Sequence, residues 1–187
     1  EELERLAAAP DTAAGAERRL ITLALRNGRL AAAEARLQSL LGERGNTALA
    51  ILYFAQLAER RGDTARAIQS YQLLADSVMG LSARASAARL LMKQGDKAEA
   101  LKLLDDHAEQ NFQDALEAGL VRAQLLVDSG DLKGALAGLD ALAERFPDHP
   151  DIDYARATAL ESGGRTRQAI STFERALQLR PEDPQLL

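Results

Sequence analysis

Residues 151–181 read DIDYARATALESGGRTRQAISTFERALQLRP. Ala, Leu, Arg and Gln, which favour helices, lie on both sides of Gly164. Glycine reaches the left-handed backbone conformation without a Cβ clash, so Gly164 is expected to end one helix in a tight turn. It is followed by Ala169, Phe173 and Ala176, at steps of five, four and three residues. The stretch therefore predicts two antiparallel helices joined by a short turn.

The same spacing recurs along the chain. The turn glycines, separated by 34, 33, 35 and 34 residues, are Gly28, Gly62, Gly95, Gly130 and Gly164. The small residue five positions later is Ala33, Ala67, Ala100, Ala135 or Ala169, and the large one after it is Leu37, Tyr71, Leu104, Leu139 or Phe173. Residues four apart share a helix face, so the Ala admits the neighbouring helix and the large residue fills the seam. One hairpin cannot bury its apolar side alone, so the pattern predicts stacked hairpins.

Acidic residues near the turns are interpreted as helix caps, since a carboxylate there accepts from free N–H groups. Those directly after a turn glycine are Asp63, Asp96 and Asp131. A second cluster, Asp148, Asp151 and Asp153, lacks the glycine and terminal Glu of a calcium loop. We expect this cluster to cap the helix that follows.

A period of about 34 residues with this pattern resembles the tetratricopeptide repeat family. The fifth copy matches the family through Gly164, Ala169, Phe173, Ala176 and Pro181. In the first three copies the closing Pro is replaced by Gly45, Met79 and Phe112, and the large aromatic residue early in the first helix is missing throughout. The superhelix pitch is therefore less defined than the repeat.

The resemblance implies an all-α, right-handed superhelical solenoid of antiparallel helix pairs. Residues 1–187 would form a single array cut from a longer one, with residues 1–10 as the end of a preceding repeat. The expected repeats are approximately 14–47, 48–80, 81–115, 116–149 and 150–183.

A narrower resemblance rests on residues 53–96, YFAQLAERRGDTARAIQSYQLLADSVMGLSARASAARLLMKQGD, and residues 143–165, AERFPDHPDIDYARATALESGGR. Both stretches resemble proteobacterial tetratricopeptide proteins that are lipid-anchored in the periplasm and partner carboxy-terminal processing proteases. This implies a periplasmic or outer-membrane-anchored protein and an adaptor role. A cytoplasmic location is the alternative.

Composition and charge limit the classes of partner that the chain is expected to bind. The net charge is −5 and the pI is about 5.2, which argues against nucleic acid, since its binders usually present a basic face. Residues 1–93 carry 13 basic and 10 acidic side chains, whereas residues 94–187 carry 10 and 18. We expect this asymmetry to steer a charged partner. No apolar run approaches the roughly 18 residues of a membrane span, so direct insertion is not expected.

In the tetratricopeptide family the first helix of each pair lines a concave groove. Transferring the groove positions onto this sequence gives candidate partner-binding residues: Arg18, Thr22, Arg26, Leu52, Gln56, Arg60, Arg89, Met92, Lys93, Leu120, Gln124, Tyr154 and Thr158. The basic ones precede residue 94, so we expect the acidic part of a bound segment to lie there. For any single polar residue, ordinary surface is the default interpretation, whereas the apolar residues could equally be buried between repeats.

Catalytic and metal-binding patterns are missing from the sequence. There is no cysteine, which excludes a disulfide, a thiolate metal site and a Cys nucleophile. His107 is expected to pack or hydrogen-bond locally, and His149 to lie in solvent; a metal site is not expected. No cofactor and no enzyme activity are predicted. The leading interpretation is a protein–protein scaffold; the alternatives are an assembly or exopolysaccharide-secretion module, a structural spacer, and a catalytic or sugar-binding helical domain.

Overall fold

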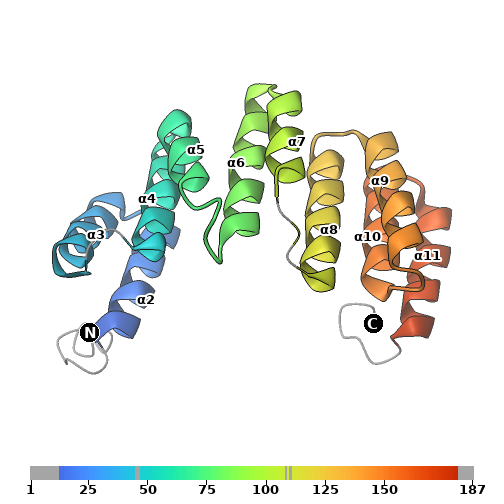
Figure 1. Cartoon of the computed structure of the whole chain (residues 1–187), viewed down its shortest axis with the longest axis horizontal. Helices are drawn as coiled ribbons and strands as arrows, with labels where there is room; N and C mark the ends of the chain where they lie inside the picture. The colour runs from blue at the N-terminus through green and yellow to red at the C-terminus, as the bar shows by residue number, and fades with distance from the viewer. Residues whose placement is uncertain (1–12, 45–46, 108, 110, 181–187) are drawn as a thin grey trace. The chain divides into compact units, whose positions relative to one another are not determined.

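The computed structural model describes residues 13–44, 47–107, 109 and 111–180, and within them every regular element is an α-helix (Figure 1). The helices are α2 (Ala13–Arg26), α3 (Leu30–Arg44), α4 (Ala48–Arg61), α5 (Thr64–Gln72), α6 (Gly80–Gln94), α7 (Lys97–Asp105), α8 (Phe112–Asp128), α9 (Leu132–Arg145), α10 (Pro150–Ser162) and α11 (Thr166–Leu179). The predicted all-α class is confirmed. The interpretation of residues 1–10 as part of a preceding repeat falls outside the described residues, as does Pro181.

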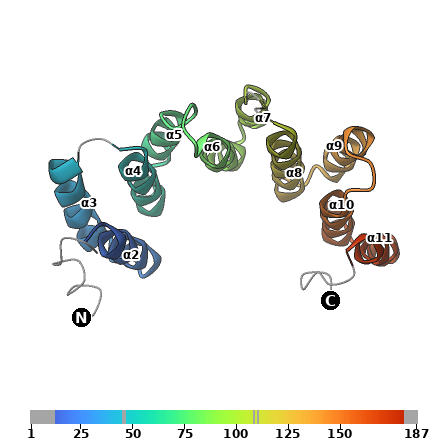
Figure 2. The ribbon, with the colours of Figure 1, turned by 60° about the horizontal axis from the view of Figure 1, so that its bottom comes forward.

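The chain divides into two compact units, Glu1–Gln94 and Gly95–Leu187. The first contains α2 to α6 and the second α7 to α11. Within each unit, successive helices pack antiparallel, as Figures 1 and 2 show for α4 with α5 and for α10 with α11. The division falls at Gly95, between the two helices of the third expected hairpin.

All five turn glycines adopt the left-handed conformation, with φ between 69° and 92°. An added Cβ would meet open space at each of them. The backbone angle alone therefore selects glycine at these turns. This confirms the interpretation of the repeating glycine as a helix-ending turn.

The small residue of each pattern copy is buried at the seam between its two helices: Ala33, Ala67, Ala100, Ala135 and Ala169 are at most 2 % exposed. The large residue four positions later is buried in four copies, whereas Phe173 is half-buried. In the first unit the seam joins a core built around Ile21, Leu37 and Leu57. In the second it joins one around Leu116, Leu139 and Ile152. The apolar pattern thus fills the cores as expected.

The predicted caps are confirmed at two of the three turns. The Asp63 carboxylate accepts from the backbone N–H of Arg66 at 3.2 Å, and that of Asp131 accepts from Gly134 at 2.9 Å. The prediction is wrong for Asp96, whose side chain makes no capping hydrogen bond. The Asp131 carboxylate also binds Lys97 at 2.6 Å, and hydrogen bonds from Lys97 and Gly134 lower the pKa of Asp131.

The capping role expected for Asp148, Asp151 and Asp153 is also wrong. His149 occupies the N-cap of α10, without a side-chain capping bond, and Asp148 lies at a φ of 55°. The Asp151 carboxylate accepts from Arg180 at 3.0 Å. Asp153 is buried and accepts from Arg175. These carboxylates tie α10 to the helix that follows it in the chain, which sequence spacing did not reveal.

Candidate functional site

The thirteen candidate residues all lie on the first helix of their pair, here called the A helices: α2, α4, α6, α8 and α10. None of them is buried. Seven are exposed: Arg18, Thr22, Arg26, Arg60, Arg89, Lys93 and Gln124. Six are half-buried: Leu52, Gln56, Met92, Leu120, Tyr154 and Thr158. Their assignment to a partner-binding groove stays a prediction.

Five basic residues on A helices of the first unit are available to an acidic partner. These A-helix cations are Arg18, Arg26, Arg60, Arg89 and Lys93. Among the described residues, none of the five forms an ion pair, and only Arg89 makes a side-chain hydrogen bond, from its Nη2 to Ser86 Oγ at 3.3 Å. The charged groups of the A-helix cations are therefore open to solvent and to an acidic partner.

In the second unit most of the basic residues form ion pairs. Six of them pair with carboxylates: Lys97 with Asp131, Arg122 with Asp105, Arg145 with Glu109, Arg156 with Asp140, Arg175 with Asp153, and Arg180 with Asp151. The hydrogen bond from Arg145 holds the pKa of Glu109 below its ordinary value. On the A helices of the second unit, α8 and α10, both basic residues, Arg122 and Arg156, are paired, so the unpaired A-helix cations lie in the first unit.

Two of the apolar candidates contribute to packing in the second unit. Leu120 packs against the core around Leu116 and Leu139. Tyr154 contacts Phe173 edge to face, with ring centroids 5.6 Å apart. Because both are only half-buried, each also leaves part of its side chain exposed to solvent. Leu120 and Tyr154 therefore each pack partly against neighbouring residues and remain partly open to solvent.

A hydrogen-bonded cluster joins the candidate Thr22 to the next A helix. The hydroxyl of Tyr53 on α4 donates to the backbone oxygen of Arg18 at 3.3 Å and lies 3.3 Å from Thr22 Oγ1. Thr22 Oγ1 itself donates to the oxygen of Arg18 at 2.8 Å. These contacts hold α2 against α4 and so fix the spacing of the cations that the two helices carry.

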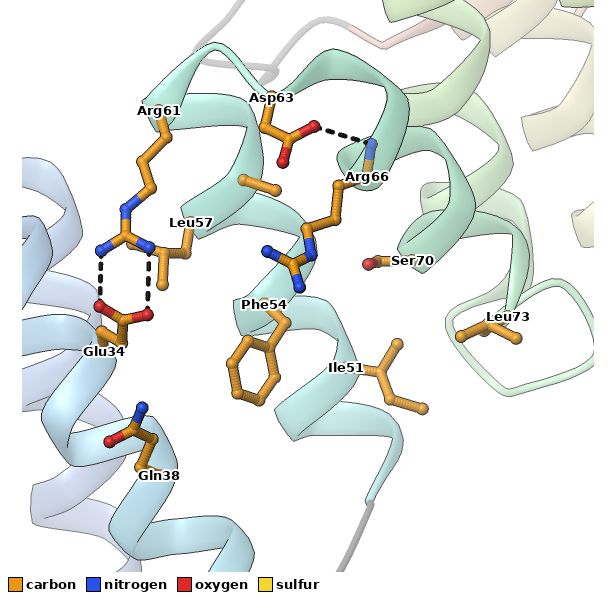
Figure 3. Close-up of a pocket in the computed structure, with 11 residues that line it drawn as sticks. Glu34, Gln38, Ile51, Phe54, Leu57, Arg61, Asp63, Arg66, Ser70 and Leu73 are labelled. Carbon is orange, nitrogen blue, oxygen red and sulfur yellow. Dashed lines mark hydrogen bonds and ion pairs between the residues drawn. The ribbon is translucent and has the colours of Figure 1, made fainter.

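The first unit also contains a pocket that sequence reasoning missed. It has a volume of about 420 Å³ and lies among α3, α4 and α5 (Figure 3). Its lining residues are Glu34, Gln38, Ile51, Phe54, Leu57, Ala58, Arg61, Asp63, Arg66, Ser70 and Leu73. We call it the α3–α5 pocket. The groove positions of the family lie on A helices, whereas this pocket also uses α3 and α5, and no sequence pattern marks it.

A bidentate ion pair closes one side of this pocket. Arg61 donates to the two carboxylate oxygens of Glu34 at 3.1 and 2.6 Å. This hydrogen bonding lowers the pKa of Glu34 and raises that of Arg61. Glu34 therefore remains ionised, and its charge is compensated within the pair.

Each of the two histidines lies beside a carboxylate. His107 Nε2 lies 3.0 and 2.9 Å from the carboxylate oxygens of Asp114, which confirms the expected local hydrogen bond. His149 is half-buried, with Nδ1 at 3.8 Å from Asp151, so its expected solvated position is wrong in part. Within the described part of the chain, no three potential ligand side chains come together as a metal site would require.

The sequence matches a tetratricopeptide repeat model over residues 18–82, 86–137 and 120–184, which together span most of its length. This chain belongs to the tetratricopeptide repeat family. The repeating Gly–Ala–large-residue pattern and the stacked helix pairs of each unit are therefore those of a tetratricopeptide protein. Among curated proteins, none matches this tetratricopeptide chain.

Solved tetratricopeptide structures share the fold. TTC0263 of Thermus thermophilus is 24 % identical with a TM-score of 0.58, and the match covers 91 % of this chain and 93 % of that one. A tetratricopeptide repeat protein of Parabacteroides merdae is 22 % identical with a TM-score of 0.61, covering 91 % and 66 %. The type IV pilus biogenesis factor PilW is 18 % identical with a TM-score of 0.57, covering 87 % and 76 %. These likenesses show the solenoid fold alone.

Membership of the family indicates a broad class of function. Tetratricopeptide proteins bind protein or peptide partners and are typically scaffolds without catalytic activity. Among its described helices, none combines the length and apolarity needed to cross a bilayer. The fold thus supports a protein–protein interaction scaffold.

Proposed function

We propose that this chain holds an acidic segment of a partner protein on the A helices of its first unit. The observation that carries the proposal is the set of A-helix cations, which are exposed and unpaired among the described residues. Arginine binds carboxylates through two parallel hydrogen bonds, and several such cations along adjacent helices favour a segment with several acidic residues.

The hydrogen-bonded cluster of Tyr53, Thr22 and Arg18 supports the proposal, because it fixes α2 against α4. A preorganised surface loses less conformational entropy on binding than a mobile one. Tetratricopeptide proteins bind protein or peptide partners, which supports a carboxylate-bearing segment as the anion that these cations meet. No catalytic step is part of the proposal.

The narrower role that we propose is an envelope adaptor for a carboxy-terminal processing protease, in a periplasmic or outer-membrane-anchored protein. It rests on the resemblance of residues 53–96 and 143–165 to such adaptors, and the solved structures add nothing to it. An assembly or exopolysaccharide-secretion module and a structural spacer are the other outcomes that the following experiment distinguishes.

The test titrates the purified chain with the purified processing protease of the same bacterium by biolayer interferometry. Binding through exposed charges should weaken about tenfold or more between about 50 mM and about 500 mM salt, because salt screens such pairs. Equal affinity at both salt concentrations would contradict binding through the A-helix cations. No binding at either concentration would reject the protease as partner and favour an assembly module or spacer.

A further inference from the structure

We propose a second binding site, the α3–α5 pocket, which takes an extended peptide segment carrying a large apolar side chain close to a carboxylate. The site is independent of the A-helix cations. It would let the first unit hold two segments at once, on different surfaces.

The two surfaces lie on opposite sides of α4. The pocket uses Ile51, Phe54, Leu57, Ala58 and Arg61 of this helix. The A-helix candidates on α4 are Leu52, Gln56 and Arg60. At about 100° of rotation per residue, the centres of these two sets lie about 160° apart around the helix axis. A ligand in the pocket therefore does not touch the A-helix candidates of α4.

Part of the pocket lining is apolar. Ile51 and Phe54 are half-buried, and both face the pocket from α4 (Figure 3). Leu73, at the end of α5, lines the pocket and is 73 % exposed. Large apolar side chains exposed around one concavity gain from contact with another apolar group that removes them from water. The apolar lining is therefore the reason why the proposed ligand carries a large apolar side chain.

The charged residues of the pocket are the reason why the proposed ligand also carries a carboxylate. Glu34 is occupied by the bidentate bond from Arg61, and Asp63 by the N–H group at the start of α5. Both acidic groups of the pocket are thus engaged. Arg66 also lines the pocket, is exposed, and makes no side-chain hydrogen bond or ion pair among the described residues.

Figure 3 shows the Arg66 guanidinium extending from α5 into the space beside Phe54. A carboxylate on the ligand can therefore meet this cation while a neighbouring apolar side chain contacts Ile51 and Phe54. Arginine is suited to this role because its planar fork binds both oxygens of a carboxylate. The lining carries no net charge, since Glu34 and Asp63 balance Arg61 and Arg66. The preference for an acidic ligand therefore rests on the open side-chain donors of Arg66, from which a carboxylate can accept.

Two polar side chains favour an extended peptide backbone. Gln38 on α3 and Ser70 on α5 line the pocket, and neither side chain makes a hydrogen bond within the described residues. An amide and a hydroxyl each offer both donor and acceptor groups, as a peptide backbone requires. A volume of about 420 Å³ lies in the range of pockets that enclose a small ligand, so it accommodates a short stretch of such a segment.

The experiment measures fluorescence polarisation of short labelled peptides with a Gly/Ser background, titrated with the full chain. In each peptide one Leu or Phe stands near one Asp or Glu; in its matched peptide the acid is replaced by Asn or Gln. The acidic peptides should bind about tenfold more tightly than their amide partners, since only they form the charge-assisted bond. Equal affinities, or no saturable binding by any peptide, would overturn the proposal.

Four variants locate the binding. Arg66→Gln should abolish the preference for acid over amide, and Leu73→Ser, at an exposed position, should weaken both peptide series alike. Arg29→Gln removes another exposed and unpaired cation, outside the pocket, and should change nothing. Arg60→Glu/Arg89→Glu should also leave peptide binding intact, and this separates the site from the proposed A-helix surface. A preference that survives Arg66→Gln but is lost in Arg60→Glu/Arg89→Glu would place the ligand on the A helices and overturn the proposal.

Discussion

Arg175 on α11 pairs with Asp153 on α10, and Asp153 is the one buried charged side chain among the described residues, at 4 % exposure. Arg175 Nε donates to Asp153 Oδ2 at 2.8 Å, and Nη2 donates to Oδ1. This hydrogen bonding raises the pKa of Arg175. The pair joins two helices that also contact each other through Tyr154 and Phe173, and α11 buries the small residues Ala169 and Ala176.

Arg175→Met should destabilise the second unit. It keeps most of the side-chain length but leaves the Asp153 carboxylate buried without this partner, at a cost of about 1–3 kcal/mol in the free energy of unfolding. Arg175 is 59 % exposed, so water recovers part of the loss and the lower half of that range is expected. Urea unfolding followed by circular dichroism measures it.

The control for this prediction is Arg167→Met, which removes an exposed, unpaired arginine from the same helix. It should change the free energy of unfolding by less than about 0.5 kcal/mol. Equal effects of the two substitutions would mean that the pair with Asp153 contributes nothing specific.

Tyr71 gives a prediction about alkaline pH. Its hydroxyl donates to Glu59 at 2.9 Å. Burial is the main cause that raises the pKa of the Tyr71 phenol, and this hydrogen bond is the second. Folding that raises the pKa of an acidic group favours its protonated form. The protein therefore gains stability at pH values below the unfolded-state pKa, about 10 for tyrosine, and loses this gain as the pH rises above that value. The wild-type protein should therefore lose stability above about pH 10 more steeply than Tyr71→Phe.

At neutral pH, Tyr71→Phe should cost about 0.5–1.5 kcal/mol, the usual net contribution of one hydrogen bond. Urea unfolding of both proteins at several pH values gives the difference in stability. That difference should shrink as pH rises beyond about 10. A difference that stays constant across this range would show that Tyr71 does not titrate with unfolding.

Two glycines of the α8–α9 hairpin should respond oppositely to alanine. Gly130 has a φ of 80°, so Gly130→Ala should destabilise the protein by about 1–2 kcal/mol. Gly138 lies inside α9, and an added Cβ would approach nothing closer than 4.0 Å. Gly138→Ala should stabilise it by about 0.5–1 kcal/mol, since alanine restricts the unfolded chain and favours helix. Thermal unfolding measures both, and a shift of the same sign would contradict this account of the turn.

The helix pairs were predictable because the features that encode them are local. A glycine at positive φ, an Ala at the seam and a large residue one turn later all act within a single hairpin. Helix caps were predictable in part: Asp63 and Asp131 bind the N–H groups three residues on, whereas Asp96 at the same position does not. The position three residues after Asp96 holds the acidic Glu99, whereas the equivalent positions after Asp63 and Asp131 hold Arg66 and Gly134.

Contacts across helices were not predictable from spacing. Tyr71 fits the apolar pattern, but its hydroxyl reaches Glu59, twelve residues earlier. Asp153 resembles a cap, yet it binds Arg175 on the following helix. The α3–α5 pocket combines three helices, and no motif marks it. In each case the partner is set by how helices pack together, which a linear pattern does not specify.

The measurement that tests the central claim most directly compares partner affinity between charge-reversal variants. Partners are captured from envelope extract by the native chain, identified by mass spectrometry, purified, and titrated against three proteins. These are the native chain, Arg60→Glu/Arg89→Glu, and Arg165→Glu/Arg167→Glu, whose exposed and unpaired arginines lie in the second unit. The account predicts that only the first variant loses affinity, by about tenfold or more, because only it reverses A-helix cations. Equal affinity of both variants and the native chain would contradict it.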